Sequence, residues 1–276
     1  MKKEKFVLGI LMLLVTNIYS QIPGIYFGTI STEDKKLVIV IDESEEKNIG
    51  IKEAMPKVME EEWNLTPYTI ISLSDFQASY VEYINDTNNL FMIFNYYKVS
   101  PLVGSNLGKK LNYRIIIIST KIKKNGNAKL YNTGAYTISL AEDLNMNIKA
   151  SLTKDVTVLK KFIEGGNGDL KKPKPIIKEK TLYINKNHLG KRGEEDIKNV
   201  YPYPFKIVEP EEYAKAILKK PEDIIFFEYI RNKDQTSASM YIFSMTKDSR
   251  IMWCRQAKGV NNYVHVNFRV LAEELK

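Results

Sequence analysis

The residues that could carry out catalysis are few and lie far apart in the sequence. Cys254 is the only cysteine, and His188 and His265 are the only two histidines. A cysteine nucleophile needs a nearby histidine as its base, so folding could bring Cys254 and His265 together as a hydrolase site. Cys254 lies in IMWCRQ, a stretch expected to form a strand, and no catalytic signature surrounds it. We therefore favour a buried structural thiol.

Neither a metal site nor a phosphate site is predicted from the other candidates. His188 falls in a predicted loop without further ligands at metal-binding spacing, and we interpret it as a surface or interface residue. The segment VGSNLGKK at residues 103–110 has glycines and lysines, but not in the spacing of a phosphate-binding loop. Glu60, Glu61 and Glu62 are consecutive, so on a helix they point in different directions, as on a solvated face. We predict no catalytic, cofactor-binding or metal-binding residues.

A short segment near the C-terminus is the candidate for contact with a partner. The stretch WCRQAK brings Trp253, Arg255 and Lys258 close together in the sequence. Tryptophan and arginine are among the residue types that most often dominate the binding energy of protein interfaces. On this basis we predict that these three residues interact with another protein.

The N-terminal residues predict export. Lys2, Lys3 and Lys5 precede an apolar run at residues 6–15, which is shorter than the ~20 apolar residues that a membrane-spanning helix needs. A basic segment followed by a short apolar run is typical of a signal peptide, here with cleavage expected after Ser20. An uncleaved N-terminal anchor is the alternative. The mature chain is therefore expected in the periplasm or outside the cell.

The chain is basic, with 41 Lys and Arg residues against 33 Asp and Glu residues, and a net charge of +8. A surplus of this sign can indicate nucleic-acid binding. The lysines are instead scattered among predicted turns, helix ends and a linker, as at residues 121–124 and 171–174, and an exported protein seldom meets nucleic acid. We interpret them as solvated residues that favour solubility, and we expect no nucleic-acid partner. Contact with anionic lipid headgroups at a membrane surface stays open.

One stretch of sequence occurs twice in similar form. PYTIISLSDF at residues 67–76 aligns without a gap on PFKIVEPEEY at residues 204–213. In each half, a predicted strand and helix precede the stretch, and a predicted strand and hairpin follow it. The same order of elements in both halves indicates a tandem duplication. The matched residues are Pro67 with Pro204, Tyr68 with Phe205, Ile70 with Ile207, Ile71 with Val208, Asp75 with Glu212, and Phe76 with Tyr213.

The resulting prediction is an α/β chain of two tandem β-α-β-α-β-β domains. Each domain is expected to be a mixed sheet with helices mainly on one face, and each is large enough to fold on its own. A signal peptide is expected at residues 1–20 and the first repeat at residues 21–138. Connecting helices and a linker containing Pro, Lys and Gly are expected at residues 139–177, and the second repeat at residues 178–276.

Local signals predict where several helices and turns begin. Ser74 with Gln77, and Ser139 with Glu142, have the spacing of a capping box and predict helix N-termini. Asn125–Gly126 predicts the turn of a hairpin.

The repeated stretches and their neighbours resemble a small α/β module of bacterial envelope proteins. Residues 68–84 with 90–94, and residues 205–219 with 224–229, each contain an aromatic residue at the start of an apolar strand, then a helix and a second apolar strand. This pattern is similar to that of the N-terminal domain of the Tol-Pal translocation protein and of the periplasmic core of the curli-secretion lipoprotein. The resemblance covers part of each repeat and implies a protein-binding or assembly role. The acylated cysteine of the curli protein has no counterpart here, so the resemblance does not extend to pore formation.

Together these features predict an exported, non-catalytic protein that binds another envelope protein. One alternative is a secreted hydrolase whose carboxylates, or Cys254 and His265, converge only in the folded chain. Another is a sensor of a small ligand or glycan with a cleft between the two halves. A compact polar pocket would favour the hydrolase, an aromatic-lined cleft the sensor, and a broad apolar patch the protein-binding role. The oligomeric state is not predicted, although exposed sheet edges could pair two domains or two chains.

Overall fold

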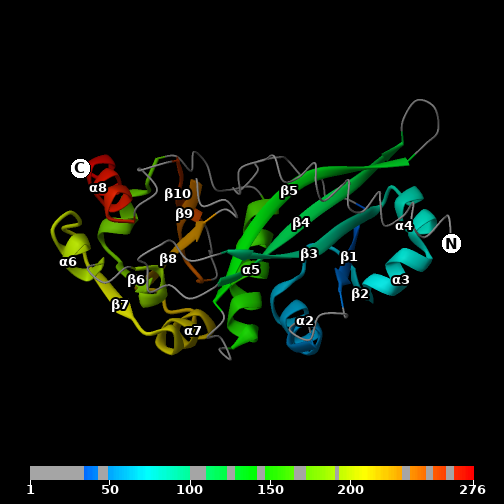
Figure 1. Ribbon diagram of the computed structural model, residues 1–276, viewed down its shortest axis with the longest axis horizontal. Coiled ribbons are helices and arrows are strands. Elements are labelled where there is room, and N and C mark those ends of the chain that lie inside the picture. Colours follow the sequence, from blue (N-terminus) through cyan, green and yellow to red (C-terminus); the bar gives the residue numbers. More distant parts are fainter. Residues whose placement is uncertain are drawn as a thin grey trace.

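The computed structural model describes residues 34–42, 49–99, 110–122, 128–141, 147–164, 172–189, 193–231, 237–246, 251–258 and 264–276. These residues form two five-stranded sheets, with helices between the sheets and on their outer sides (Figure 1). The predicted signal peptide lies outside the described residues. Among the helices that are described, none is both long and apolar enough to cross a membrane.

The first half of the chain forms one mixed sheet and its covering helices. Its elements are β1 (Lys36–Ile41), α2 (Ile49–Glu62), β2 (Tyr68–Ser72), α3 (Leu73–Ala78), α4 (Tyr80–Asn85), β3 (Asn89–Val99), β4 (Lys110–Ile122) and β5 (Ala128–Ala141). The strand order is β2-β1-β3-β4-β5. The strand β1 pairs in parallel with β2 and β3, and β4 is antiparallel to both β3 and β5. The predicted Asn125–Gly126 turn lies outside the described residues, but its flanking strands do form an antiparallel pair.

The second half forms another mixed sheet with the same strand order. Its elements follow the helix α5 (Ile148–Ile163) and are η2 (Pro175–Lys178), β6 (Thr181–Asn185), η3 (Lys186–His188), α6 (Gly193–Lys198), β7 (Phe205–Val208), α7 (Pro210–Lys219), β8 (Ile224–Arg231), β9 (Ser237–Phe243), β10 (Ile251–Lys258) and α8 (Val264–Glu274). The order β7-β6-β8-β9-β10 matches the order in the first sheet, element for element. The pattern of parallel and antiparallel pairs is also the same.

The repeated stretch occupies the same place in both sheets. Tyr68 begins β2 opposite Leu37 of β1, and Phe205 begins β7 opposite Leu182 of β6. In both halves, the helix after this strand buries the aromatic residue that ends the match. The halves therefore share a strand order, a register and a short sequence pattern. A duplication as their common origin stays a prediction.

The predicted α/β class with two mixed sheets is confirmed, but the helices cover both faces of each sheet instead of mainly one. The chain moves across the first sheet from β1 to β2 and then back past β1 to β3. Because crossovers between parallel strands are almost always right-handed, this reversal moves the second connection to the other face. Accordingly, α2 and α5 pack on the inner face, and α3 and α4 pack on the outer face. In the second sheet, α7 lies on the inner face, and α6 and α8 lie on the outer face.

The helix α5 lies between the two sheets. Residues 152–159 are buried without exception, although they include Thr153, Lys154, Asp155 and Thr157. A helix that is buried all round must be surrounded by other elements. Here α2 and β5 of the first half, and α7 and β10 of the second half, contact it, and Figure 1 shows α5 between the two sheets. One apolar core therefore includes residues from both halves.

Two predicted helix starts differ from the structure. The residue that caps α3 is Ser72 instead of Ser74: the Ser72 hydroxyl accepts a hydrogen bond from the Asp75 amide at 2.9 Å and donates one to the Asp75 carboxylate at 2.7 Å. Ser139 lies in β5, whose pairing with β4 continues through Ala141. Two strong strands held together by a long ladder outweigh a local capping pattern.

Candidate functional site

Cys254 and His265 do not form a catalytic pair. Cys254 is 9% exposed on β10 and belongs to the core between the sheets. His265 is on α8, which packs against the opposite face of the second sheet. Burial raises the pKa of the Cys254 thiol to about 12, so the sulfur is protonated near neutral pH. The interpretation of Cys254 as a buried thiol is confirmed, and the Cys254–His265 alternative is wrong because the sheet separates the two residues.

The predicted contact residues on β10 are mainly used inside the molecule. Trp253 is 1% exposed, and its indole N–H donates to Glu274 Oε2 at 3.1 Å. Arg255 points to the same face of the sheet, and its Nε donates to Asn267 Oδ1 at 2.9 Å. Trp253 is therefore corrected from a binding anchor to a core residue, because α8 covers this face. Lys258 ends β10, and its side chain lies outside the description.

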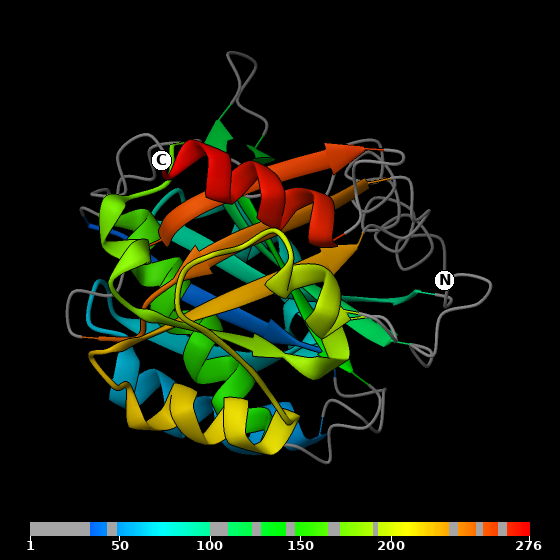
Figure 2. The ribbon, with the colours of Figure 1, turned by 90° about the vertical axis from the view of Figure 1, so that its left-hand side faces the viewer.

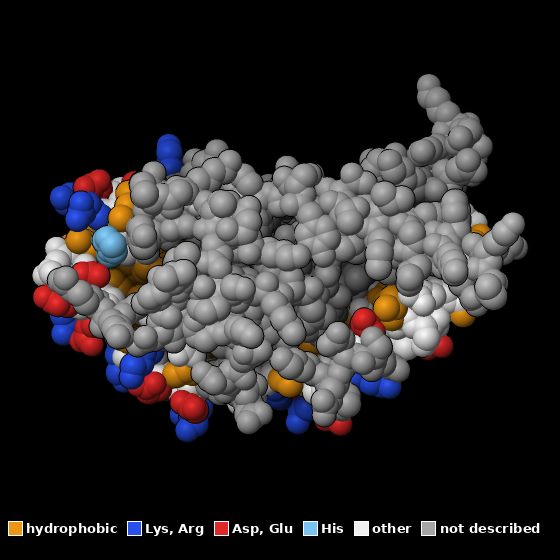
Figure 3. Space-filling view, in the orientation of Figure 1, with side chains coloured by type: hydrophobic (Ala, Val, Ile, Leu, Met, Phe, Trp, Pro, Cys, Tyr) orange, Lys and Arg blue, Asp and Glu red, His pale blue; other side chains and the backbone are white. Residues whose placement is uncertain are grey.

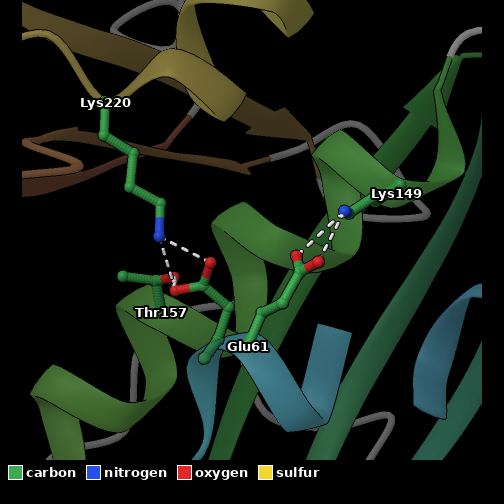
Figure 4. A network of polar contacts seen from close by, with 5 residues as sticks. Glu61, Lys149, Thr157 and Lys220 are labelled. Atoms are coloured by element: carbon green, nitrogen blue, oxygen red, sulfur yellow. Dashed lines mark hydrogen bonds and ion pairs between the residues drawn. The ribbon is translucent and has the colours of Figure 1, made fainter. Parts of the chain in front are cut away.

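The three consecutive glutamates of α2 divide between solvent and the second half. Glu60 is exposed, as predicted. Glu61 pairs with Lys149 of α5 at 2.9 Å, and this hydrogen bond lowers the pKa of the Glu61 carboxyl. Glu62, by contrast, has a side chain only 10% exposed and accepts from Lys220 Nζ at 2.5 and 2.7 Å (Figure 4). The prediction of a solvated face is therefore wrong for Glu62.

Glu62, Thr157 and Lys220 connect α2, α5 and the end of α7. The Thr157 hydroxyl donates to Glu62 Oε2 at 3.0 Å. Lys220 follows α7 in the left-handed conformation, with φ 51° and ψ 51°, and its amide N–H donates to the carbonyl of Ala216 at 3.0 Å. Glycine is the usual residue in that conformation, which costs other residues about 1–2 kcal/mol. A glycine here would lack the ammonium that reaches Glu62. We call these three residues the outer clamp.

A second polar cluster lies deeper, where α5 meets the second sheet. Lys154 Nζ is 2.7 Å from Glu228 Oε2 and 3.5 Å from Asp155 Oδ1. His188 Nε2 is 3.2 Å from Glu228 Oε1. None of the four residues is more than 6% exposed. We call Lys154, Asp155, His188 and Glu228 the buried charge cluster.

The strand order of the second sheet places this cluster. His188 ends the short η3 turn directly after β6, and the Asn185 side chain accepts from the Asn187 amide at 3.0 Å to hold that turn. Glu228 is on β8, the parallel neighbour of β6. The carboxyl ends of β6 and β8 form the point where the chain reverses its direction across the sheet, and open α/β sheets commonly bind ligands at such points. In this protein, the ammonium of Lys154 occupies that place.

Mutual attraction keeps the cluster charged despite its burial. Burial alone would lower the pKa of Lys154, but the charges of Asp155 and Glu228 outweigh it and raise that pKa above its ordinary value. Burial alone would raise the pKa of Glu228, but the charges of Lys154 and His188 and the hydrogen bonds from both lower it to about 2. Lys154 and Glu228 are therefore both ionised near neutral pH. Such a cluster can hold α5 against the sheet, whereas acid–base catalysis would also require access for a substrate.

Sequence reasoning missed the buried charge cluster. His188 was interpreted as a surface or interface residue, whereas its ring is buried against Tyr213 and Phe227, with centroids 6.4 and 6.3 Å away. A usable signal does exist in the sequence. Glu228 interrupts the apolar run IIFFEYI, and a charge inside a strand buried on both faces must have a partner. Nothing in one sequence identifies that partner as Lys154.

One pocket is described on the outer side of the second sheet. It has a volume of about 380 Å³ and lies between the end of α6 and α8, where Lys198, Tyr201, Arg269 and Lys276 contribute to its lining. The lining includes no residue of the buried charge cluster and neither Cys254 nor His265. Among the described residues, no group of three or more His, Cys, Asp or Glu side chains is placed to hold a metal ion.

Comparison with known proteins adds little. No protein family and no curated protein matches the sequence. A PelC dodecamer from Paraburkholderia phytofirmans is a similar solved structure, with 12% sequence identity and a TM-score of 0.26. The match covers 48% of this chain and 93% of that chain. At this TM-score the likeness says nothing about what the present chain does.

Proposed function

We propose that this protein is exported and non-catalytic, and that it acts as an assembly module by binding another protein of the cell envelope along an open sheet edge. The N-terminal segment and the resemblance of the repeated stretches to envelope modules support the location. The feature that carries the binding role is the edge strand β5.

The strand β5 is long and pairs on one side with β4 among the described residues. It runs from Ala128 to Ala141, with one bulge where Ile117 and Ile118 of β4 face Gly134 and Asn132. The strand also passes close to β8 of the second half. An edge strand presents a row of backbone N–H and C=O groups that can pair with a strand from another protein. After the bulge, β5 pairs regularly with β4 from Gly134 to Ala141. The opposite edge of this stretch suits pairing with an extended segment of a partner protein.

The buried charge cluster is poorly placed for catalysis, because the side chains of Lys154 and Glu228 are only 5% and 3% exposed and a substrate would have to reach them. The charges on the described surface are mixed in sign, as the alternation of acidic and basic side chains along the lower edge in Figure 3 indicates. The shared core also fills the described contact between the halves, where a sensor would need a cleft.

The edge-binding proposal can be tested with two neighbouring proline variants in β5. Successive N–H groups of a strand point to opposite sides, so one of Tyr136→Pro and Thr137→Pro removes a hydrogen bond to β4, and the other removes an outward N–H. We expect the first variant to lose about 1–3 kcal/mol of stability, because a carbonyl of β4 loses its hydrogen bond. The second should fold normally but lose its partner when residues 21–276 are crosslinked in intact cells and isolated.

A matched control uses the edge of the second sheet. The same pair of changes in β10, Gln256→Pro and Ala257→Pro, should leave partner capture intact in whichever variant folds normally. Full capture by the well-folded β5 variant would overturn the edge-binding proposal. A wild-type chain that crosslinks to no protein at all would overturn the assembly role, and screens for hydrolase activity and ligand binding would then follow.

A further inference from the structure

The pocket between α6 and α8 has a basic lining, and we call it the α6–α8 pocket. Figure 1 shows both helices at the end of the molecule that lies away from the first half. Among the described residues that line the pocket, Lys198, Arg269 and Lys276 are cations and Glu273 is an anion. With three cations against one carboxylate, the described lining carries an excess of two positive charges.

Two of these cations are not used within the described part of the chain. The side chains of Arg269 and Lys276 are exposed, and neither makes a hydrogen bond or an ion pair with a described residue. A cation in the last turn of a helix can offset the partial negative charge of the helix end. Arg269 lies before the last turn of α8, which ends at Glu274, so this effect does not account for it.

The third cation is held only loosely. Lys198 Nζ lies 2.7 Å from Oε1 of Glu194, one turn earlier on α6, and the two side chains are 63% and 61% exposed. A pair as exposed as this contributes little stability, because water screens the attraction and both side chains lose freedom when they pair. The Lys198 ammonium can therefore turn to an anion in the pocket at little cost.

The rest of the lining offers apolar surface beside a buried hydroxyl. Val200, Pro202 and Ala272 supply apolar atoms. Tyr201 also lines the pocket and is only 2% exposed, and its hydroxyl has no hydrogen-bond partner among the described residues. Buried polar groups are usually paired, so a ligand oxygen that reached this hydroxyl would complete it. The volume of about 380 Å³ is that of a site for a small molecule.

We infer that the α6–α8 pocket binds a small phosphate ester. A phosphate monoester carries a charge of about −1.5 to −2 near neutral pH, which matches the excess positive charge of the lining. The Arg269 guanidinium can donate two parallel hydrogen bonds to phosphate oxygens, whereas a lysine ammonium acts as a point charge. The carbon part of the ester would rest on the apolar surface. A free phosphate ester and the phosphate headgroup of a lipid share this chemistry, and binding measurements separate the two sources.

Glycerol 3-phosphate is the soluble probe. In isothermal titration calorimetry at low ionic strength, the wild type should bind it with saturation. Arg269→Gln and Lys276→Gln should each weaken this binding about tenfold or more, because each removes a charge-assisted hydrogen bond. Both changes are at exposed positions, and circular dichroism would verify that the variants are folded. Lys215→Gln is the matched control: this exposed lysine is on α7, which covers the opposite face of the sheet, and its loss should leave binding unchanged.

Vesicles that contain phosphatidic acid in phosphatidylcholine are the lipid probe, because their headgroup is a phosphate monoester. Co-sedimentation that is lost in Arg269→Gln and kept in Lys215→Gln would assign the lipid as the source of the phosphate. Binding of glycerol 3-phosphate with the same pattern, without such co-sedimentation, would assign a free ester. The inference is overturned if, for both probes, Arg269→Gln binds no more weakly than Lys215→Gln, which includes the case in which neither probe binds the wild type. None of these results depends on whether β5 binds a partner.

Discussion

At the scale of single residues, burial decides how much an ion pair contributes. Lys186 and Glu209 pair at the surface with side chains 61% and 60% exposed, and such pairs contribute about 0–1 kcal/mol. The side chains of Lys154 and Glu228 are 5% and 3% exposed, so each needs the other to remain charged at low cost. Removing one partner of a buried pair typically costs about 3–5 kcal/mol, whereas replacing both by apolar residues can be neutral.

This difference predicts the outcome of a double-mutant cycle on the buried pair. Lys154→Met alone and Glu228→Leu alone should each lower the free energy of unfolding by about 3–5 kcal/mol, because each takes a charged partner away from the buried charges that remain. The double variant should lose clearly less than the sum of the two single losses, although it also removes the Lys154 ammonium from Asp155. Urea unfolding of the wild type, the two single variants and the double variant near neutral pH measures the free energies of unfolding that the cycle compares. Additive losses in the double variant would contradict a buried pair.

The same carboxylate gives an acid dependence of known sign. The pKa of Glu228 is lowered to about 2 in the folded chain, against about 4.3 for an ordinary glutamate. Its stabilising contribution is therefore complete above about pH 4.3 and is lost as the pH falls toward about 2. In urea unfolding, the stability difference between the wild type and Glu228→Gln should shrink over this interval. A difference that stays constant in acid would exclude the lowered pKa.

At the scale of elements, short helices depend strongly on their caps. The helix α3 has six residues, and Ser72 both accepts from the Asp75 amide and donates to the Asp75 side chain. Ser74 Oγ lies 2.8 Å from Ser72 Oγ but does not cap the helix. A helix of this length has little stability of its own, so its first turn relies on the cap and on packing.

The cap makes a prediction that separates two nearby serines. Ser72→Ala should lower the free energy of unfolding by about 1 kcal/mol, since the Asp75 amide loses its partner. Ser74→Ala serves as the matched control and should cost less, because Ser74 is exposed. Thermal or urea unfolding of both variants decides between them. The reverse ranking would restore Ser74 as the capping residue.

The elements also show how far the sequence alone leads. Strands such as KLVIVI and IIFFEYIR were predictable because continuous apolar runs are typical of strands buried on both faces. An apolar run of this kind shows that a strand is present, but it does not show to which face each side chain points. For this reason Trp253 was wrongly predicted to contact a partner. The helix start at Ser139 failed because the β4–β5 ladder outweighs a local signal. The buried charge cluster joins residues that lie far apart in the sequence. Glu228 is 40 residues from His188 and 74 residues from Lys154, and it contacts both.

At the scale of the whole molecule, the two halves share one core through α5. The core contains Leu37 and Met59 from the first half and Phe226 and Tyr241 from the second, and α5 lies between them. The outer clamp and the buried charge cluster both cross the same contact. Domains that share a large apolar contact lose their independence, because opening that contact exposes apolar surface on both sides.

A shared core predicts that the described halves unfold together. Differential scanning calorimetry near neutral pH should show one transition, with equal calorimetric and van't Hoff enthalpies. Glu62→Gln weakens the outer clamp and should lower the midpoint without splitting the transition, whereas Glu60→Gln, at an exposed position, should leave it almost unchanged. Two separate transitions in the wild type would show that the halves fold as independent domains.

The layer order of the two sheets has one further consequence. In the first half, the sheet face that α2 and α5 cover is turned toward the second half. In the second half, the matching sheet face, which α6 and α8 cover, points outward (Figure 2). The contact is therefore head to tail between unlike surfaces, and a contact of this kind can in principle repeat without limit. Charge on the terminal faces opposes such repetition: Glu194, Lys198, Arg269 and Glu273 are exposed at one end, and Asp75 and Glu82 at the other. Replacing these residues with apolar ones is the change that would turn a two-unit stack into a growing polymer.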